Sequence, residues 1–132
     1  MDTPPNLGFL TVNALVCADR VLAPVSAEDG ASLHGIREVR QTVRRLAERL
    51  AVRMPELTAL LTRWQRTRIS SRNAEEQLAA HGLAPVARIP CAVGAHRERR
   101  SPPVPLALSD PDSSPAIAYQ HLANTLERVS AQ

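Results

Sequence analysis

The chain has 132 residues, of which 44% are hydrophobic, so it can bury the core of one domain and is not a wholly disordered chain. All 16 basic residues are arginine and none is lysine, and against 13 acidic residues they give a formal net charge of +3. Neither cysteine has a His or Cys neighbour at metal-ligand spacing, so the sequence indicates no zinc site and no disulfide framework.

The first half of the chain predicts two helices separated by a buried strand. Residues 2–8 contain two prolines and read as a turn before a helix over residues 7–18. Polar residues interrupt this apolar stretch and no basic segment precedes it, so we expect neither a signal peptide nor a membrane span, and a cytoplasmic protein. Residues 20–25 predict a strand. Residues 32–53 predict an amphipathic helix. Its apolar positions recur at steps of three and four: Ile36, Val39, Val43, Leu46 and Leu50.

The second half predicts two further strands and two further helices. Residues 57–62 read as a strand, and residues 63–68 as the loop that leaves its carboxyl end. Ser70 or Ser71 is expected to cap a helix that ends at Gly82. Residues 84–89 predict the third strand. A Pro- and Arg-rich loop over residues 94–115, irregular apart from residues 106–108, then leads to a helix over residues 115–129, whose inward residues are expected to be Ile117, Leu122, Leu126 and Val129.

The alternation of helices and strands predicts an α/β fold with a parallel sheet and helices on both faces, about three strands and four to five helices. In such sheets ligands bind at the loops that leave the carboxyl ends of the strands. These loops begin near Ser26, Arg63 and Pro90. A binding site is therefore expected where these three loops meet.

Arginines gather in the middle third of the chain. Residues 37–72 contain ten arginines and three glutamates. An arginine side chain is always charged and its fork of donors fits phosphate oxygens, so this block is suited to nucleic acid or to an acidic partner. The same pattern is equally typical of a solvated helix face, and composition alone leaves both interpretations open.

The order of motifs resembles that of the ParA-type partition ATPases. Residues 2–15 are similar to the family's switch segment, in which an aspartate and two prolines precede a helix that carries Asn-Ala-Leu, here Asn13 to Leu15. Later blocks resemble the family in order along nearly the whole chain: residues 18–25 with Glu28 and Gly35, residues 60–62 with 66–70, Ile89-Pro90, and Asp110-Pro111 with Ala118-Tyr119. The double proline favours the chromosome or plasmid partition branch of the deviant phosphate-loop ATPases, and the polar residues 127–132 lack the membrane helix of the cell-division branch.

The resemblance implies the C-terminal portion of a doubly wound sheet, as a single incomplete domain over residues 1–132 with the switch segment at residues 1–6. Family members bind ATP and Mg²⁺ with a glycine-rich phosphate loop that bears two lysines, and this chain has no lysine. We therefore expect no ATP hydrolysis by that mechanism and no cofactor for this chain alone. Because Met1 directly precedes Asp2, where the family has a strand, the chain is expected to begin inside the family's motif.

The resemblance also assigns roles to particular residues. Asp2 falls on the position of the family's switch aspartate, which helps to hold Mg²⁺. The alternative interpretation is that Asp2 is only a residue at the entry to a helix. Arg66 falls on a family position for sequence-independent DNA binding, and the alternative is a local ion pair. The arginines beside it share its chemistry: Arg63, Arg68 and Arg72. Pro90 falls where the family packs adenine, but Cys91-Ala92 replace the usual Arg-Asn, which puts base recognition in doubt.

A lone tryptophan at a strand end, Trp64, is expected to pack rather than to stack a base. The favoured function is a partition protein without ATPase activity that retains non-specific DNA binding or dimerisation, and that is nucleoid-associated if DNA binding survives. A ParB-like partner is implied by the family, and no membrane partner is expected. The alternatives are one half of a split ATPase that a chain with the N-terminal half completes, and an inert truncated product.

Overall fold

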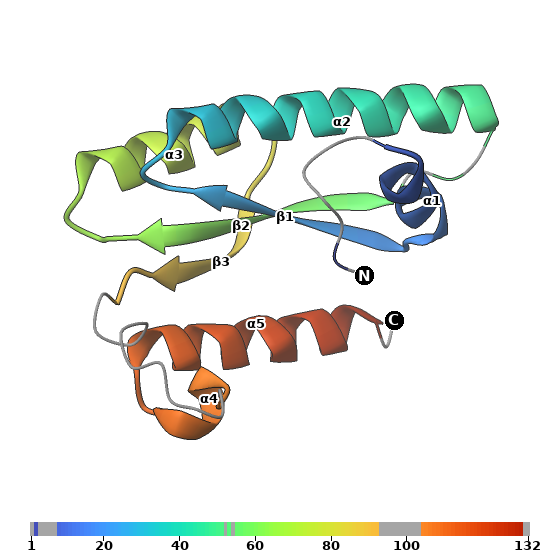
Figure 1. Ribbon diagram of the computed structural model, residues 1–132. Helices are drawn as coiled ribbons and strands as arrows, with labels where there is room; N and C mark the ends of the chain where they lie inside the picture. Colours follow the sequence, from blue (N-terminus) through green and yellow to red (C-terminus); the bar gives the residue numbers. More distant parts are fainter. Residues whose placement is uncertain (1, 3–7, 52, 54, 93–103, 131–132) are drawn as a thin grey trace.

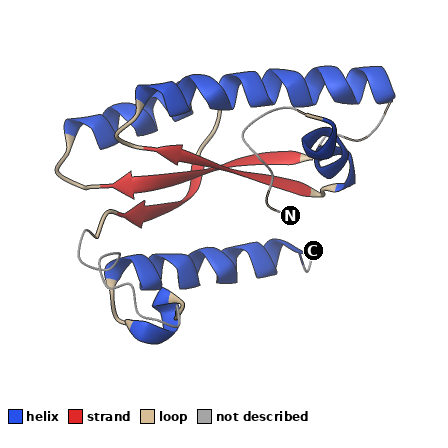
Figure 2. Ribbon diagram, in the orientation of Figure 1, coloured by secondary structure: helices blue, strands red, loops and turns tan. Residues whose placement is uncertain are grey.

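The computed structural model describes residues 2, 8–51, 53, 55–92 and 104–130, and it consists of a parallel sheet with helices on both faces (Figures 1 and 2). The sheet contains three strands in the order β1-β2-β3. Their bounds are β1 (Arg20–Ser26), β2 (Glu56–Trp64) and β3 (Pro85–Pro90). β1 and β2 pair in one unbroken register from Arg20 opposite Glu56 to Ser26 opposite Thr62. The α/β fold with a parallel sheet is therefore confirmed.

Two layers of helices enclose the sheet. The helices are α1 (Phe9–Cys17), α2 (Gly30–Leu50), α3 (Ile69–Ala80), α4 (Leu106–Ser109) and α5 (Ser114–Ser130). Figure 1 shows α2 and α3 on one side of the sheet and α5 on the other, with the short α4 beside α5. No helix within these described residues is long and apolar enough to cross a membrane.

The larger core lies between the sheet and the α2–α3 layer. It is aliphatic, as the near absence of aromatic residues requires, and its buried members are Val25, Ala27, Leu33, Ile36, Ala59, Leu61, Ala74, Leu78 and Leu83. The apolar stripe of α2 is confirmed, because Ile36 and Val43 are buried and Val39 and Leu46 are half-buried. The side chain of Leu50 lies outside the described part.

A smaller core lies under α5, where Leu122 packs with Leu60 and Ile89. Leu122 and the half-buried Leu126 point inward as predicted, but Ile117 is 41% exposed, so that part of the prediction is wrong. Leu122 follows Ile117 by five positions, which is about 500° of helical rotation and leaves their side chains about 140° apart. The side chain of Val129 is outside the described residues.

Two boundaries near the end of β2 differ from the prediction. Arg63 and Trp64 belong to the strand rather than to the following loop, and the pairing of β2 with β3 is irregular between Leu61 and Trp64. α3 begins at Ile69, and neither Ser70 nor Ser71 caps it, because the N-cap residue is Arg68 and makes no side-chain cap.

The end of α3 and the later loop follow the prediction. The helix ends before Gly82, whose φ of +68° is a left-handed conformation that glycine adopts without strain. The apolar residues 106–108 are helical within α4. Residues 93–103 of the predicted loop, and residues 1 and 3–6 of the predicted switch segment, lie outside the described residues.

Candidate nucleic-acid interface

The carboxyl ends of the three strands lie together, as the parallel order requires. Backbone hydrogen bonds continue from the ladder into the loops: the N–H of Ala27 donates to the carbonyl of Thr62 at 2.9 Å, and the N–H of Cys91 to that of Trp64 at 3.1 Å. The backbone directly after β1 and directly after β3 is thereby fixed to β2 at Ala27 and at Cys91.

Glu28, in the loop after β1, holds two of the predicted DNA-binding arginines. Its carboxylate accepts from Nε of Arg63 at 2.7 Å through one oxygen, and from Nη1 of Arg68 through the other. The backbone N–H of Glu28 donates a hydrogen bond to Oγ of Ser26 at 3.3 Å, which holds the backbone of the loop at this residue. Arg63 and Arg68 are therefore partly neutralised. The sequence places Glu28 in a block that resembles the family but does not reveal its contact with Arg63, because a contact over 35 residues leaves no local pattern.

The backbone of Arg63 adopts a left-handed conformation, with φ of 54°. This region is unfavourable for a residue with a long side chain, and such strain persists only where the surroundings fix it. Here the strand on one side is fixed by Oγ1 of Thr62, which donates to the carbonyl of Val25 at 3.2 Å, and the side chain is fixed by Glu28. The strain coincides with the irregular pairing at the end of β2.

Arg66 and Arg72 are the exposed arginines of this edge that remain unpaired. Neither side chain has a salt bridge or a hydrogen bond within the part of the chain that the structure describes. Arg66 lies in the turn over residues 65–68 and Arg72 in the first turn of α3. No side chain caps the start of α3, so the partial positive charge of its N–H groups adds to that of the two arginines. Among the described residues, Arg66 therefore has no local ion pair.

The turn that carries Arg66 is rigid. The N–H of Arg68 donates to the carbonyl of Gln65 at 3.1 Å, and the N–H of Gln65 donates to Oγ of Ser71 at 3.0 Å. Ser71 is only 1% exposed, so water does not compete for its hydroxyl. The buried hydroxyl of Ser71 therefore links the first turn of α3 to the turn that carries Arg66.

Trp64 packs, as expected, and it also takes part in a polar network. Its indole lies against the larger core while Nε1 donates to Glu75 at 2.7 Å. Arg88 on β3 donates to the same carboxylate with Nε at 2.8 Å and Nη2 at 3.1 Å. The hydrogen bonds from Arg88 and then Trp64 lower the pKa of Glu75 against the opposing effect of burial, and the contact with Glu75 raises the pKa of Arg88.

The other predicted site residues do not join a cluster. Asp2 is exposed, and the residues that the structure describes contain no group of three or more His, Cys, Asp or Glu side chains that would hold a metal ion. Pro90 is half-buried at the end of β3, opposite Trp64. The metal role of Asp2 and the adenine role of Pro90 stay predictions.

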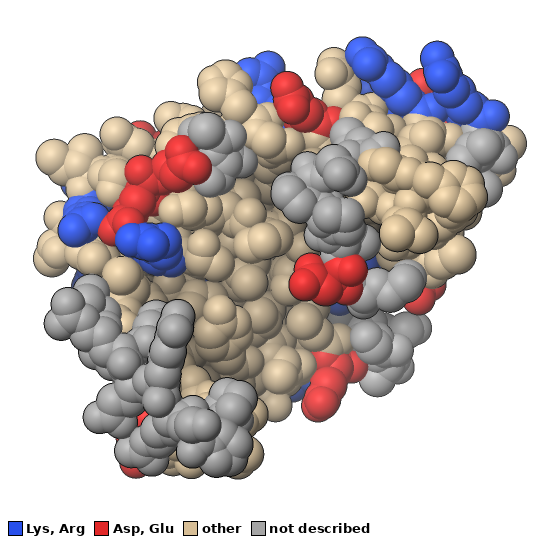
Figure 3. All heavy atoms as spheres, viewed as in Figure 1, with Lys and Arg blue, Asp and Glu red and all other residues tan. Residues whose placement is uncertain are grey.

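The charges at this edge are mixed. In Figure 3, basic and acidic side chains lie against one another at the left of the molecule, where the strand arrows of Figure 1 end, and basic side chains also gather at the upper right, over the later turns of α2, with acidic atoms among them. The edge of the sheet is thus a surface of mixed charge, not a uniformly basic one.

The fold and this edge define an α/β protein with a parallel sheet and a polyanion-compatible site at the strand ends. A family model described as an AAA domain matches residues 1–55. The chromosome partitioning protein ParA of Caulobacter vibrioides is 33% identical over 81 residues, which cover 61% of this chain and 30% of that protein. The chromosome-partitioning ATPase Soj of Thermus thermophilus is 36% identical over 81 residues, 61% of this chain and 32% of that protein.

Over this matched part the chain is similar to the ParA/Soj-type partition ATPases. The matched part spans about a third of the length of these two relatives.

Proposed function

We propose that this chain is a partition protein that binds double-stranded DNA without sequence preference through Arg66 and Arg72. The observation that carries the proposal is the pair of exposed, unpaired guanidinium groups beside the uncapped start of α3. An arginine fork suits phosphate oxygens, and contacts to the backbone position a protein on DNA without reading its bases. The rigid turn under Arg66 lowers the entropy lost on binding.

We further propose that the chain does not hydrolyse ATP by itself. The sequence contains no lysine, whereas the mechanism implied by the resemblance uses two lysines on a phosphate loop. ATP and Mg²⁺ then belong to family members that carry the phosphate loop and its lysines, rather than to the activity of this chain alone. DNA binding is accordingly expected to be independent of ATP.

The names of the two relatives concern chromosome partitioning, and a partition system is the proposed context for this chain as well. Association with the nucleoid follows from non-specific DNA binding. A ParB-like protein and a second copy of this chain are the proposed protein partners, both on the strength of the resemblance.

Fluorescence anisotropy with a labelled non-specific duplex tests the DNA interface. The slope of log affinity against log salt falls by about 0.9 for each lost phosphate contact, so a variant with Arg66→Gln and Arg72→Gln is expected to lose about 1.8 from the slope. Arg128→Gln, an exposed arginine in the last turn of α5, is the control for general charge. Affinity that ignores salt, or an equal loss in both variants, would contradict the proposal.

The open edge of β1 favours one other function, that of half of a split ATPase. Within the described residues β1 pairs only with β2, so its other edge leaves backbone N–H and C=O groups without a strand. Parallel sheets are usually covered and extended on both sides, which makes this edge a template for strands from another chain.

Mixing this chain with a polypeptide that holds a ParA-type phosphate loop and the preceding strands tests the second candidate. Restored ATP turnover would support it, and unchanged turnover with no complex on size-exclusion chromatography would reject it. A chain that neither binds DNA nor forms this complex would be an inert product.

A further inference from the structure

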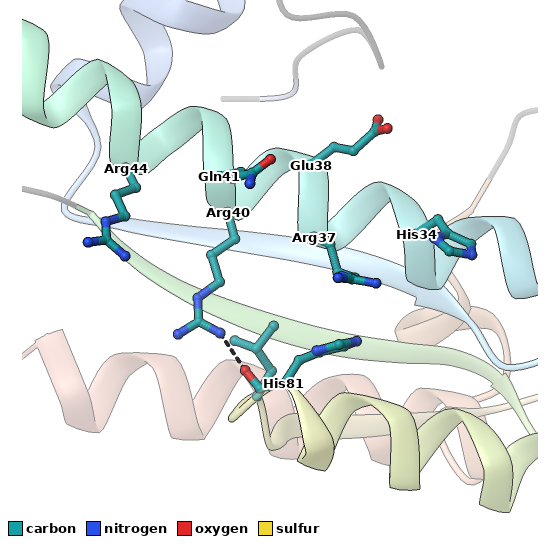
Figure 4. A pocket seen from close by; sticks show the side chains of 8 residues that line it. His34, Arg37, Glu38, Arg40, Gln41, Arg44 and His81 are labelled. Carbon is teal, nitrogen blue, oxygen red and sulfur yellow. Dashed lines mark hydrogen bonds between the residues drawn. The ribbon is translucent and has the colours of Figure 1, made fainter.

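A second cationic site lies between α2 and the turn after α3. The groove has a volume of about 420 Å³, and its lining includes His34, Arg37, Arg40, Arg44 and His81 (Figure 4). A volume of this size is typical of sites for small ligands. None of these residues belongs to the DNA interface proposed above, so the groove is a separate feature of the molecule.

The three arginines form a stripe along one side of α2. They are three and four residues apart, the spacing that places side chains next to one another on a helix. In Figure 4 all three extend toward the side of the helix on which His81 lies. From Arg37 to Arg44 the stripe rises by about 10 Å along the helix axis, which is longer than a single phosphate group.

Few acidic groups oppose this stripe. Glu38 is the one carboxylate in the lining, and in Figure 4 its side chain extends to the opposite side of α2 from Arg37. Arg44 has an ion pair with Glu48 at 3.0 Å, but both side chains are more than 60% exposed, so the pair is weak. Arg37 has no ion pair or hydrogen bond from its side chain within the described residues.

Arg40 joins the two walls of the groove. Its Nη1 donates to the backbone carbonyl of His81, the residue that ends α3, so the guanidinium lies across the groove (Figure 4). A guanidinium has five donors, and this bond uses one of them. Arg40 therefore satisfies the carbonyl of His81 at the end of α3 and still has donors for a ligand. The hydrogen bond to this carbonyl holds the guanidinium in place before a ligand binds.

We propose that this groove binds a chain of two or more phosphate groups through Arg37, Arg40 and Arg44. The length of the stripe, the volume of the groove and the small number of opposing carboxylates, of which only the exposed Glu48 forms an ion pair with the stripe within the described residues, together match such a ligand. The phosphates belong either to a free polyphosphate chain or to the backbone of a nucleic acid strand, which present the same oxygens to the arginines.

Isothermal titration with sodium tripolyphosphate at constant ionic strength tests the groove. We expect saturable binding that a variant with Arg37→Gln and Arg44→Gln weakens about tenfold or more. The matched control carries Arg45→Gln and Arg49→Gln, two exposed arginines on the same helix that do not line the groove. Glu38→Gln is expected to strengthen binding, because it removes the carboxylate of the lining.

The same variants against a non-specific duplex distinguish the two sources. If the groove variant weakens duplex binding as well, and duplex displaces tripolyphosphate, the source is a nucleic acid backbone; if it weakens tripolyphosphate binding alone, the source is a free polyphosphate. Loss of duplex binding in the Arg66 and Arg72 variant, with tripolyphosphate binding intact, separates this groove from the proposed DNA interface. No saturable binding of tripolyphosphate, or equal weakening in the groove and control variants, would overturn the proposal.

Discussion

The guanidinium of Arg63, the penultimate residue of β2, lies 2.7 Å from the carboxylate of Glu28 in the loop after β1. Arg68 binds the other oxygen of the same carboxylate. Glu28 thus forms ion pairs with two of the four arginines that the sequence analysis proposes for DNA binding. Within the described residues the other two, Arg66 and Arg72, form no ion pair. The number of arginines at this edge that are free of an ion pair within the described residues is therefore set by an acidic residue as well as by the basic ones.

Glu28→Gln is therefore expected to strengthen binding to a non-specific duplex by roughly tenfold at low salt, since it frees two arginines for phosphate. The dependence on salt should become steeper by up to about 1.8, or about 0.9 for each freed arginine. Anisotropy in a salt series measures both quantities.

Glu56→Gln is the matched control for this gain. It removes the same charge and breaks an ion pair of similar length, that with Arg20 at 2.8 Å, but at the amino end of the strands. A gain of the same size in this variant would show that net charge, rather than the freed arginines, is responsible.

Ser71→Ala is expected to destabilise the fold by about 1 to 2 kcal/mol, because the N–H of Gln65 loses its acceptor in a site that water does not reach. Ser70→Ala, at the exposed neighbouring position, should change the free energy of unfolding by less than about 0.5 kcal/mol. Urea unfolding followed by the fluorescence of Trp64, the one tryptophan of the sequence, measures both. Equal losses would mean that both serines act on the helix terminus instead.

The ion pair of Glu75 and Arg88 predicts a dependence of stability on pH. The contacts of Arg88 and Trp64 hold the pKa of Glu75 below its ordinary value of 4.5, so this carboxylate stabilises the fold above that pH and loses its contribution as the pH falls through the lower, folded-state value. Glu75→Gln should cost about 1 kcal/mol or less at pH 7, and the difference from the wild type should narrow below pH 4.5.

Glu76→Gln provides the control, since Glu76 is exposed on the same helix and has no ion pair within the described residues. The measurement is the free energy of unfolding of the wild type and both variants between pH 7 and pH 3. A difference for Glu75→Gln that stays constant down to pH 3 would contradict the assignment.

The fold was predictable because its signals are local. The stripe from Ile36 to Leu46 in α2 and the left-handed stop at Gly82 each depend on residues within a few turns of one another. The end of β2 was not, because tertiary contacts hold Arg63 and Trp64 in the strand: one binds Glu28 and the other pairs with Pro90 and binds Glu75.

The sequence predicts where the candidate site lies, but not which of its arginines are paired with an acidic residue. The parallel order puts the strand ends together, and the arginines around them are visible in the sequence. Which of them is neutralised depends on Glu28, 35 residues before Arg63, and the groove under α2 depends on the distant residue His81. Contacts at such separations have no signature in spacing.

The two faces of α5 offer a last test of the packing. Leu122 is 6% exposed and packs with Leu60 and Ile89, so Leu122→Ala removes buried methyl groups and leaves a cavity between helix and sheet. We expect a loss of about 2 to 4 kcal/mol in the free energy of unfolding. Ile117→Ala removes a side chain of similar size that is 41% exposed, and alanine raises the helix propensity, so the expected loss is below about 1 kcal/mol. Urea unfolding of both variants compares them directly. A larger loss from Ile117→Ala would mean that the periodicity read from the sequence, and not the observed orientation of α5, describes the protein in solution.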